Sequence, residues 1–109
     1  MPIEKTLISG SMSMLILKLL AEKDMYGYEM IDTLRKRSEN VFELKAGTLY
    51  PLLHSLEEKN YLSCYEQEVS GKVRKYYQLT KEGQKFLEKK QVEWEQYTEA
   101  VTKVLAFEL

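Results

Sequence analysis

Three basic side chains lie close together past the middle of the chain, at Lys72, Arg74 and Lys75. They follow Ser70-Gly71, a turn-forming pair that separates two segments rich in β-branched and aromatic residues, which predicts a β-hairpin with a positively charged tip. Ammonium and guanidinium groups bind the phosphates of nucleic acids. Basic hairpin tips are also common as simple solvated turns, so the hairpin needs a second element to indicate a nucleic-acid site.

A short amphipathic segment immediately before the hairpin supplies that element. Its leucines recur at the i, i+3, i+4, i+7 spacing of a helix, at Leu49, Leu52, Leu53 and Leu56. We expect Thr48 as its N-cap, Pro51 in its first turn and Asn60 as the left-handed residue that ends it. The opposite face carries groups suited to base edges and phosphates, or else to a plain polar surface: Thr48, Tyr50, His54 and Ser55, with Lys45 just before the helix.

Two further helices are expected upstream. Residues 8–20 have apolar side chains on two faces, so one face is free for a partner. Residues 26–37 form the second predicted helix, with Asp24 as a plausible cap and Gly27 as a point of close approach for another helix. Its expected inner face consists of Tyr28, Ile31 and Leu34.

The predicted strands cover residues 62–69 and 73–79, and Thr80 is expected to cap a last helix. The order helix, helix, helix, strand, strand, helix describes a winged helix-turn-helix protein. The fold class is therefore α+β, mostly α, with an extra C-terminal dimerisation helix. We place the winged helix, including the N-terminal helix, in residues 1–80 and the dimerisation helix of the same compact unit in residues 81–109.

The last helix contains an aromatic and aliphatic seam with the a/d spacing of a coiled coil, interrupted at Lys90. A long amphipathic terminal helix with such a seam suits a helix–helix dimer interface better than the core of a monomer. The expected interface residues are Leu87, Trp94, Tyr97, Val101 and Val104.

Composition narrows the function class. The formal net charge of the 109 residues is −1, so a nucleic-acid footprint must be local. A second basic run, Arg35-Lys36-Arg37, ends a helix where positive charge suits the dipole, and we take it as structural. One histidine, His54, and one cysteine, Cys64, form no catalytic or metal-ligand pattern, so we expect no enzyme, metal or cofactor.

The lone cysteine also fits a reduced, cytoplasmic setting. The sequence has no signal peptide pattern, and its longest apolar run is too short to span a bilayer, so we expect no membrane association.

Several motifs together resemble the PadR family of bacterial transcriptional regulators, over nearly the whole chain. These motifs are Tyr26-Gly27-Tyr28-Glu29, Gly47-Thr48-Leu49-Tyr50-Pro51-Leu52-Leu53, Arg74-Lys75-Tyr76-Tyr77 and Leu79-Thr80-x-x-Gly83. The short length is similar to the second subfamily, which has a single C-terminal helix. The resemblance implies a homodimeric repressor on a pseudo-palindromic double-stranded operator, with recognition helices in successive major grooves and wings over the flanking backbone.

The resemblance also implies roles for single residues. Tyr50 matches a tyrosine that usually lies at the DNA. Trp94 matches the tryptophan that, in a drug-binding member, pairs with its symmetry mate around flat aromatic ligands, which would suit a small planar aromatic or cationic molecule. Met14, Leu87 and Gln91 are possible lining residues of that site. Relief of repression by such a ligand is an expectation of the resemblance.

Two alternatives remain open from the residues themselves. A winged-helix protein that serves as a protein-interaction module would also fit the near-zero net charge. A ligand-binding protein of the same fold, without operator binding, would use the aromatic seam as its main site. Neither the operator, the regulated genes nor the inducer can be read from the sequence.

Overall fold

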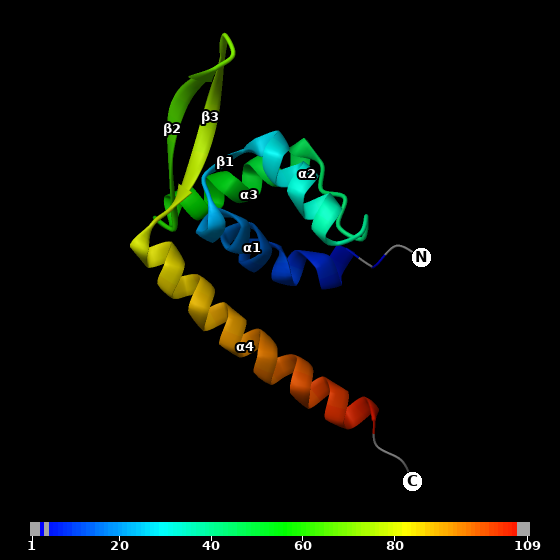
Figure 1. The fold of residues 1–109 in the computed structure, drawn as a ribbon. Coiled ribbons are helices and arrows are strands. Elements are labelled where there is room, and N and C mark those ends of the chain that lie inside the picture. The colour runs from blue at the N-terminus through cyan, green and yellow to red at the C-terminus, as the bar shows by residue number, and fades with distance from the viewer. Residues whose placement is uncertain (1–2, 4, 107–109) are drawn as a thin grey trace.

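The protein is described by a computed structural model that covers residues 3 and 5–106. Its helices are α1 (Lys5–Glu22), α2 (Gly27–Arg37), α3 (Ala46–Glu58) and α4 (Lys81–Leu105), and its strands are β1 (Met25–Tyr26), β2 (Leu62–Val69) and β3 (Lys72–Leu79). The predicted α+β winged helix-turn-helix, mostly α, is confirmed. Figure 1 shows the β2–β3 hairpin projecting from the α1–α3 body on one side and α4 running away on another.

The core forms where these elements meet, because each contributes an apolar face. Ile16 and Leu17 of α1, Met30 of α2 and Leu53 of α3 are fully buried, as is Tyr77 of β3. Within the described part of the chain, every buried side-chain nitrogen or oxygen has a hydrogen-bond partner. No helix in residues 3 and 5–106 is long and apolar enough to cross a membrane.

The sheet is antiparallel, in the order β1-β3-β2. Its hairpin turn consists of Ser70 and Gly71, which both have positive φ, at 53° and 81°. Two central residues with positive φ match the twist of the flanking strands in a two-residue turn. The predicted hairpin is therefore confirmed, although Lys72 belongs to β3 and β1 was not expected.

The N-terminus of α2 differs from the prediction. The helix begins at Gly27, and its cap residue Tyr26 makes no side-chain capping bond. Asp24 does not cap it and instead accepts a 2.7 Å hydrogen bond from the hydroxyl of Tyr65 on β2. The inner face is set by Gly27, Met30 and Leu34, so Tyr28 points outward and is 66% exposed. Placing Tyr28 on the inner face was wrong.

The start of α3 also lies earlier than expected. Lys45 is the cap residue, and its carbonyl accepts from the amide of Leu49 at 2.9 Å. Thr48 is therefore inside the helix rather than its N-cap, and Pro51 lies in the second turn. The proline leaves the carbonyl of the exposed Gly47 without its usual i+4 donor, and solvent can replace that donor. Asn60, with a φ of 65°, ends the helix as predicted.

Helix α4 begins as the sequence indicated, because the Thr80 hydroxyl accepts from the amide of Gly83 at 2.9 Å. Gly83 is buried, and a Cβ on it would overlap the backbone carbonyl of Tyr61. Close approach of α4 to the segment before β2 therefore requires glycine at this position.

Gly83→Ala is expected to lower the free energy of unfolding by about 1–3 kcal/mol, because the backbone carbonyl of Tyr61 must move. Urea denaturation measures this change. Gly47→Ala is the matched control, since a Cβ there would meet nothing within 4 Å. The control should leave stability unchanged or slightly raise it. Alanine favours a helix more than glycine does at both positions, so an equal loss in both variants would mean that the close contact at Gly83 does not govern the effect.

The seam of α4 divides into two parts. Leu87 is 1% exposed and packs in the core of its own subunit. Leu87 is buried because this first part of α4 lies against the body of the protein. Trp94, Tyr97, Val101 and Val104, farther along α4, are 36–76% exposed.

Candidate nucleic-acid interface

The exposed strip of α3 defines the first part of the site. Gly47, Pro51, His54 and Glu58 are exposed and recur at three- and four-residue spacing, opposite the buried Leu49, Leu53 and Leu56. Tyr50 lies along one flank of this strip, and Thr48 and Ser55 lie along the other. The polar face expected from the sequence is thus present. Of its residues, His54 lies within the strip, and Thr48, Tyr50 and Ser55 lie along its flanks.

Tyr50 is half-buried because it packs onto the start of α2. A Cβ on Gly27 would overlap the Tyr50 hydroxyl, so the absence of a side chain at Gly27 admits the ring. The expected close approach of a helix at Gly27 is confirmed. Tyr50 lines a groove of about 380 Å³ together with Tyr26, Tyr28 and the three hairpin cations. The groove therefore joins the N-termini of α2 and α3 to the hairpin.

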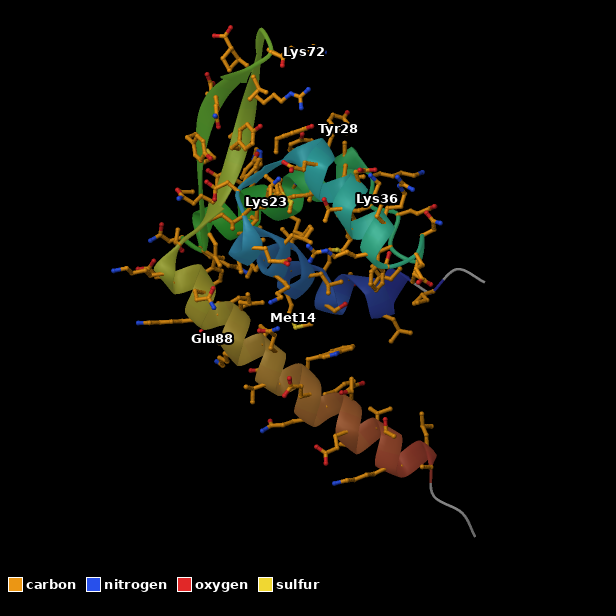
Figure 2. All side chains as sticks on the ribbon, viewed as in Figure 1. Met14, Lys23, Tyr28, Lys36, Lys72 and Glu88 are labelled. Carbon is orange, nitrogen blue, oxygen red and sulfur yellow. The ribbon has the colours of Figure 1, made fainter. Side chains whose placement is uncertain are left out.

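The hairpin cations are not neutralised by neighbouring carboxylates. Among the ion pairs of residues 3 and 5–106, none involves Lys72, Arg74 or Lys75. No aspartate or glutamate lines the groove. Figure 2 shows Lys72 near the end of the hairpin and Tyr28 on α2. The groove is thus a positive surface that is also lined by tyrosines, and its positive charge suits phosphate groups.

The basic residues at the end of α2 form ion pairs, unlike the hairpin cations, as expected for a structural cluster. Arg35 and Lys36 both pair with Asp32, at 2.7 and 2.9 Å. Arg37 pairs with Glu22 of α1, and this contact raises the pKa of Arg37 and lowers that of Glu22. These cations pair with carboxylates of α2 and α1. Of the two basic clusters, the one on the hairpin is therefore left without ion pairs among the described residues.

Lys75 and Arg74 lie on opposite faces of β3, because neighbouring strand residues alternate. The ammonium of Lys75 is 5.5 Å from the centre of the Tyr77 ring. Tyr77 is the main cause that raises the pKa of Lys75, with Cys64 and Glu57 adding to it. Lys75 therefore keeps its positive charge at neutral pH.

Cys64 is half-buried on β2 and donates to the carboxylate of Glu57 at 3.3 Å. Burial, and then this carboxylate, raise the pKa of the thiol. A protonated thiol is a poor nucleophile, so these contacts favour Cys64 as an ordinary strand residue. In the described residues, no three His, Cys, Asp or Glu side chains come together as a metal site.

Lys45 and Thr48 lie away from the hairpin groove. They line a second groove of about 470 Å³ together with Ile8, Met12 and Leu52. The structure therefore does not bring all the candidate residues together. Tyr50 joins the hairpin cations, His54 lies on the exposed strip, and Lys45 and Thr48 lie beyond its other edge.

Tyr50→Phe is expected to weaken binding to duplex DNA by at least about tenfold per subunit, as the loss of one hydrogen bond to a charged phosphate implies. The thermal midpoint should not change, because the ring still covers Gly27. Fluorescence anisotropy and thermal melting measure the two effects. Tyr61→Phe is the control, since Tyr61 stacks on Phe86 away from the groove. A fall in thermal midpoint with unchanged DNA affinity would make Tyr50 a packing residue only.

The aromatic part of α4 lines a third groove, also of about 470 Å³. Its walls come from α1, with Leu7 and Met14, and from α4, with Trp94 and Tyr97. In Figure 2, Met14 lies on the side of α1 that faces α4. Of the four residues expected at a ligand, Trp94 and Met14 line this groove. Gln91 does not line it, and Leu87 belongs to the core.

Sequence reasoning missed Tyr26 and Tyr28 as residues of the hairpin groove. Tyr26 occupies β1, a strand of two residues that has no alternation to detect. Tyr28 was placed on the wrong face of its helix.

The chain is similar in sequence to known proteins. The family model described as transcriptional regulator PadR-like family matches residues 16–89. A Lysinibacillus sphaericus protein named uncharacterized protein X is 36% identical over 100 residues, covering 91% of this chain and 92% of that one.

Solved structures of transcriptional regulators have the same fold and related sequences. A transcriptional regulator from Clostridium thermocellum is 35% identical with a TM-score of 0.85, covering 91% of this chain and 97% of that one. A PadR family transcriptional regulator from Eggerthella lenta is 32% identical with a TM-score of 0.84, covering 94% and 88%. The chain therefore belongs to the PadR-like family of transcriptional regulators.

Proposed function

We propose that the protein is a dimeric repressor that binds a pseudo-palindromic operator in double-stranded DNA. The observation that carries this proposal is the groove of about 380 Å³ in which Lys72, Arg74 and Lys75 have no carboxylate partner. In this arrangement α3 presents its exposed strip to the major groove, and the hairpin contacts the flanking backbone. Base edges are met by His54 and its neighbours, and phosphates by the hairpin cations and Tyr50.

Dimerisation is supported by the exposed apolar side chains of α4. Trp94, Tyr97, Val101 and Val104 lie on one side of the helix and remain 36–76% exposed in the single chain. A continuous apolar stripe of this kind is characteristic of a protein–protein contact. In the proposal residues 81–109 join two subunits, and residues 1–80 of each subunit reach one half of the operator. The last part of that dimerisation segment, residues 107–109, lies outside the described residues.

The proposed DNA binding is tested by fluorescence anisotropy with a labelled duplex from upstream of the protein's own gene, compared with a shuffled duplex of the same composition. Selective binding by two chains per duplex, weakening steeply with salt, is the expected result. Equally weak, salt-insensitive binding to both duplexes would favour a protein-interaction module instead.

The groove between α1 and α4 favours ligand control as a second role. It is lined by the indole of Trp94, the phenol of Tyr97 and the thioether of Met14, and also by Glu93 and Lys90, which pair with each other at 3.1 Å. Such a surface suits a planar aromatic cation. A ligand there would relieve repression only if it preferred a spacing of the two recognition helices that does not fit DNA. Quenching of Trp94 fluorescence by planar cations, together with release of operator, would support this role.

A further inference from the structure

A row of three tyrosines crosses the outer face of the sheet. Tyr76 on β3 is paired in register with Tyr26 on β1 and with Tyr65 on β2. The Tyr65 and Tyr76 rings stack with centroids 5.7 Å apart, and the Tyr26 ring meets Tyr76 edge-on at 5.5 Å. Side chains directly opposite each other on neighbouring strands interact in this way. The row therefore fixes the orientation of the Tyr26 ring.

The row is held at its β2 end as well. The Tyr65 hydroxyl donates to Asp24, which directly precedes β1, at 2.7 Å. This hydrogen bond is the main cause that raises the pKa of Tyr65, so the phenol stays protonated and the bond persists at neutral pH. A closed loop of contacts thus joins β2, β3 and the segment before α2.

Arg74 lies on this platform. It is two residues before Tyr76 on β3 and so shares the outer face of the sheet. Its guanidinium carbon is 4.2 Å from the centre of the Tyr26 ring, within cation–π distance. Arg74 is half-buried, whereas Lys72 and Lys75 are exposed. The stacked guanidinium also lines the groove shared with Tyr50.

We propose that Tyr26 is a positioning residue that holds the Arg74 guanidinium in place for one phosphodiester of the bound duplex. The inference rests on the proposed DNA binding and adds a residue outside α3 and the hairpin to it. A free arginine side chain must be immobilised when it binds, and a guanidinium already stacked on a ring loses less freedom per bond formed. A guanidinium stacked on a ring face keeps its N–H groups in its own plane, where they remain available for a bidentate phosphate contact.

The test uses Tyr26→Phe, Tyr26→Leu, Arg74→Ala and the double variant Tyr26→Leu with Arg74→Ala. Tyr26→Phe retains the ring and should bind DNA like the original protein. Tyr26→Leu should bind about two- to fivefold more weakly per subunit, the value of an exposed cation–π contact. Its salt dependence should stay nearly unchanged, because the charge of Arg74 remains. In the Arg74→Ala background, Tyr26→Leu should have no further effect.

An independent readout is the NMR spectrum of the free protein. The δ protons of Arg74 should be shifted upfield by the Tyr26 ring, and Tyr26→Leu should abolish that shift while Tyr26→Phe retains it. If Tyr26→Leu proves unstable, Tyr26→Met replaces the ring by a flexible apolar chain of similar size, with the same expected results.

The outcomes separate the two proposals. If the original protein fails to bind duplex DNA, the proposed function falls and this inference with it. If it binds normally and Tyr26→Leu does too, only the positioning role is overturned. A loss in Tyr26→Phe equal to that in Tyr26→Leu would overturn the positioning role and assign the Tyr26 hydroxyl to the DNA. A Tyr26→Leu loss that persists without Arg74, with Tyr26→Phe unaffected, would overturn it and assign the ring itself to the DNA.

Discussion

Val101→Glu is expected to convert the dimer into monomers that no longer bind the operator. Val101 lies in the middle of the exposed apolar side of α4, between Tyr97 and Val104. Pairing that side with a second copy would bury the new carboxylate without a cationic partner, which costs several kcal/mol. Because each half of a pseudo-palindrome needs its own recognition helix, a monomer loses the gain from binding both halves.

Sedimentation equilibrium measures the dimer, and anisotropy with labelled operator measures the DNA affinity. Thr102→Glu is the matched control, since Thr102 is exposed on a different face of α4 and also gains one negative charge. The control should stay dimeric. Circular dichroism should be the same for both variants, because this part of α4 extends beyond the body. A Val101→Glu protein that remains dimeric would refute the seam as the interface.

Replacing Lys72, Arg74 and Lys75 together by alanine is expected to weaken binding to every duplex by at least about 100-fold. The three side chains contribute six positive charges per dimer, none of them paired within the described residues. Each phosphate contact adds about 0.9 to the slope of log affinity against log salt, so the slope should fall by about five. Specificity should change less than affinity, because phosphate contacts do not read sequence.

Alanine at Lys81, Lys85 and Lys89 together is the control for that experiment. These lysines recur every four residues along the exposed outer face of α4, and the variant loses the same total charge. The control should retain nearly the original affinity and slope. A control that fell as far as the hairpin variant would mean that general charge, rather than the hairpin, attracts DNA. An unaffected hairpin variant would remove the wing from the mechanism.

The hairpin and the start of α4 could be predicted because their signals are local. Ser70-Gly71 suits a tight turn and Thr80 suits a helix cap whatever the rest of the chain does. The start of α3 was misplaced for a physical reason. Pro51 was assigned to a first turn, but the exposed Gly47 carbonyl tolerates the missing donor one turn later. Local rules thus located the four helices and the two hairpin strands, but they missed β1 and misplaced the start of α3.

The tyrosine row could not be predicted, because it depends on which strands pair and in which register. Nothing in the sequence shows that Tyr26 lies opposite Tyr76, since β1 has only two residues and is held by its partner strand. The split of the α4 seam is likewise nonlocal. Leu87 and Trp94 share the same heptad spacing, but Leu87 is 1% exposed in the core and Trp94 is 45% exposed. How deeply each seam residue is buried depends on how closely α4 packs on the rest of the protein at that point.

The most direct measurement of the central claim is an NMR titration of isotope-labelled protein with operator duplex. The proposal predicts that the largest amide shift changes occur along the exposed strip of α3 and at Lys72, Arg74 and Lys75. Changes are also expected at Tyr26 and Tyr28, and little change along the outer lysines of α4. Shift changes confined to α4, or absent from both α3 and the hairpin at saturating DNA, would contradict the proposed interface.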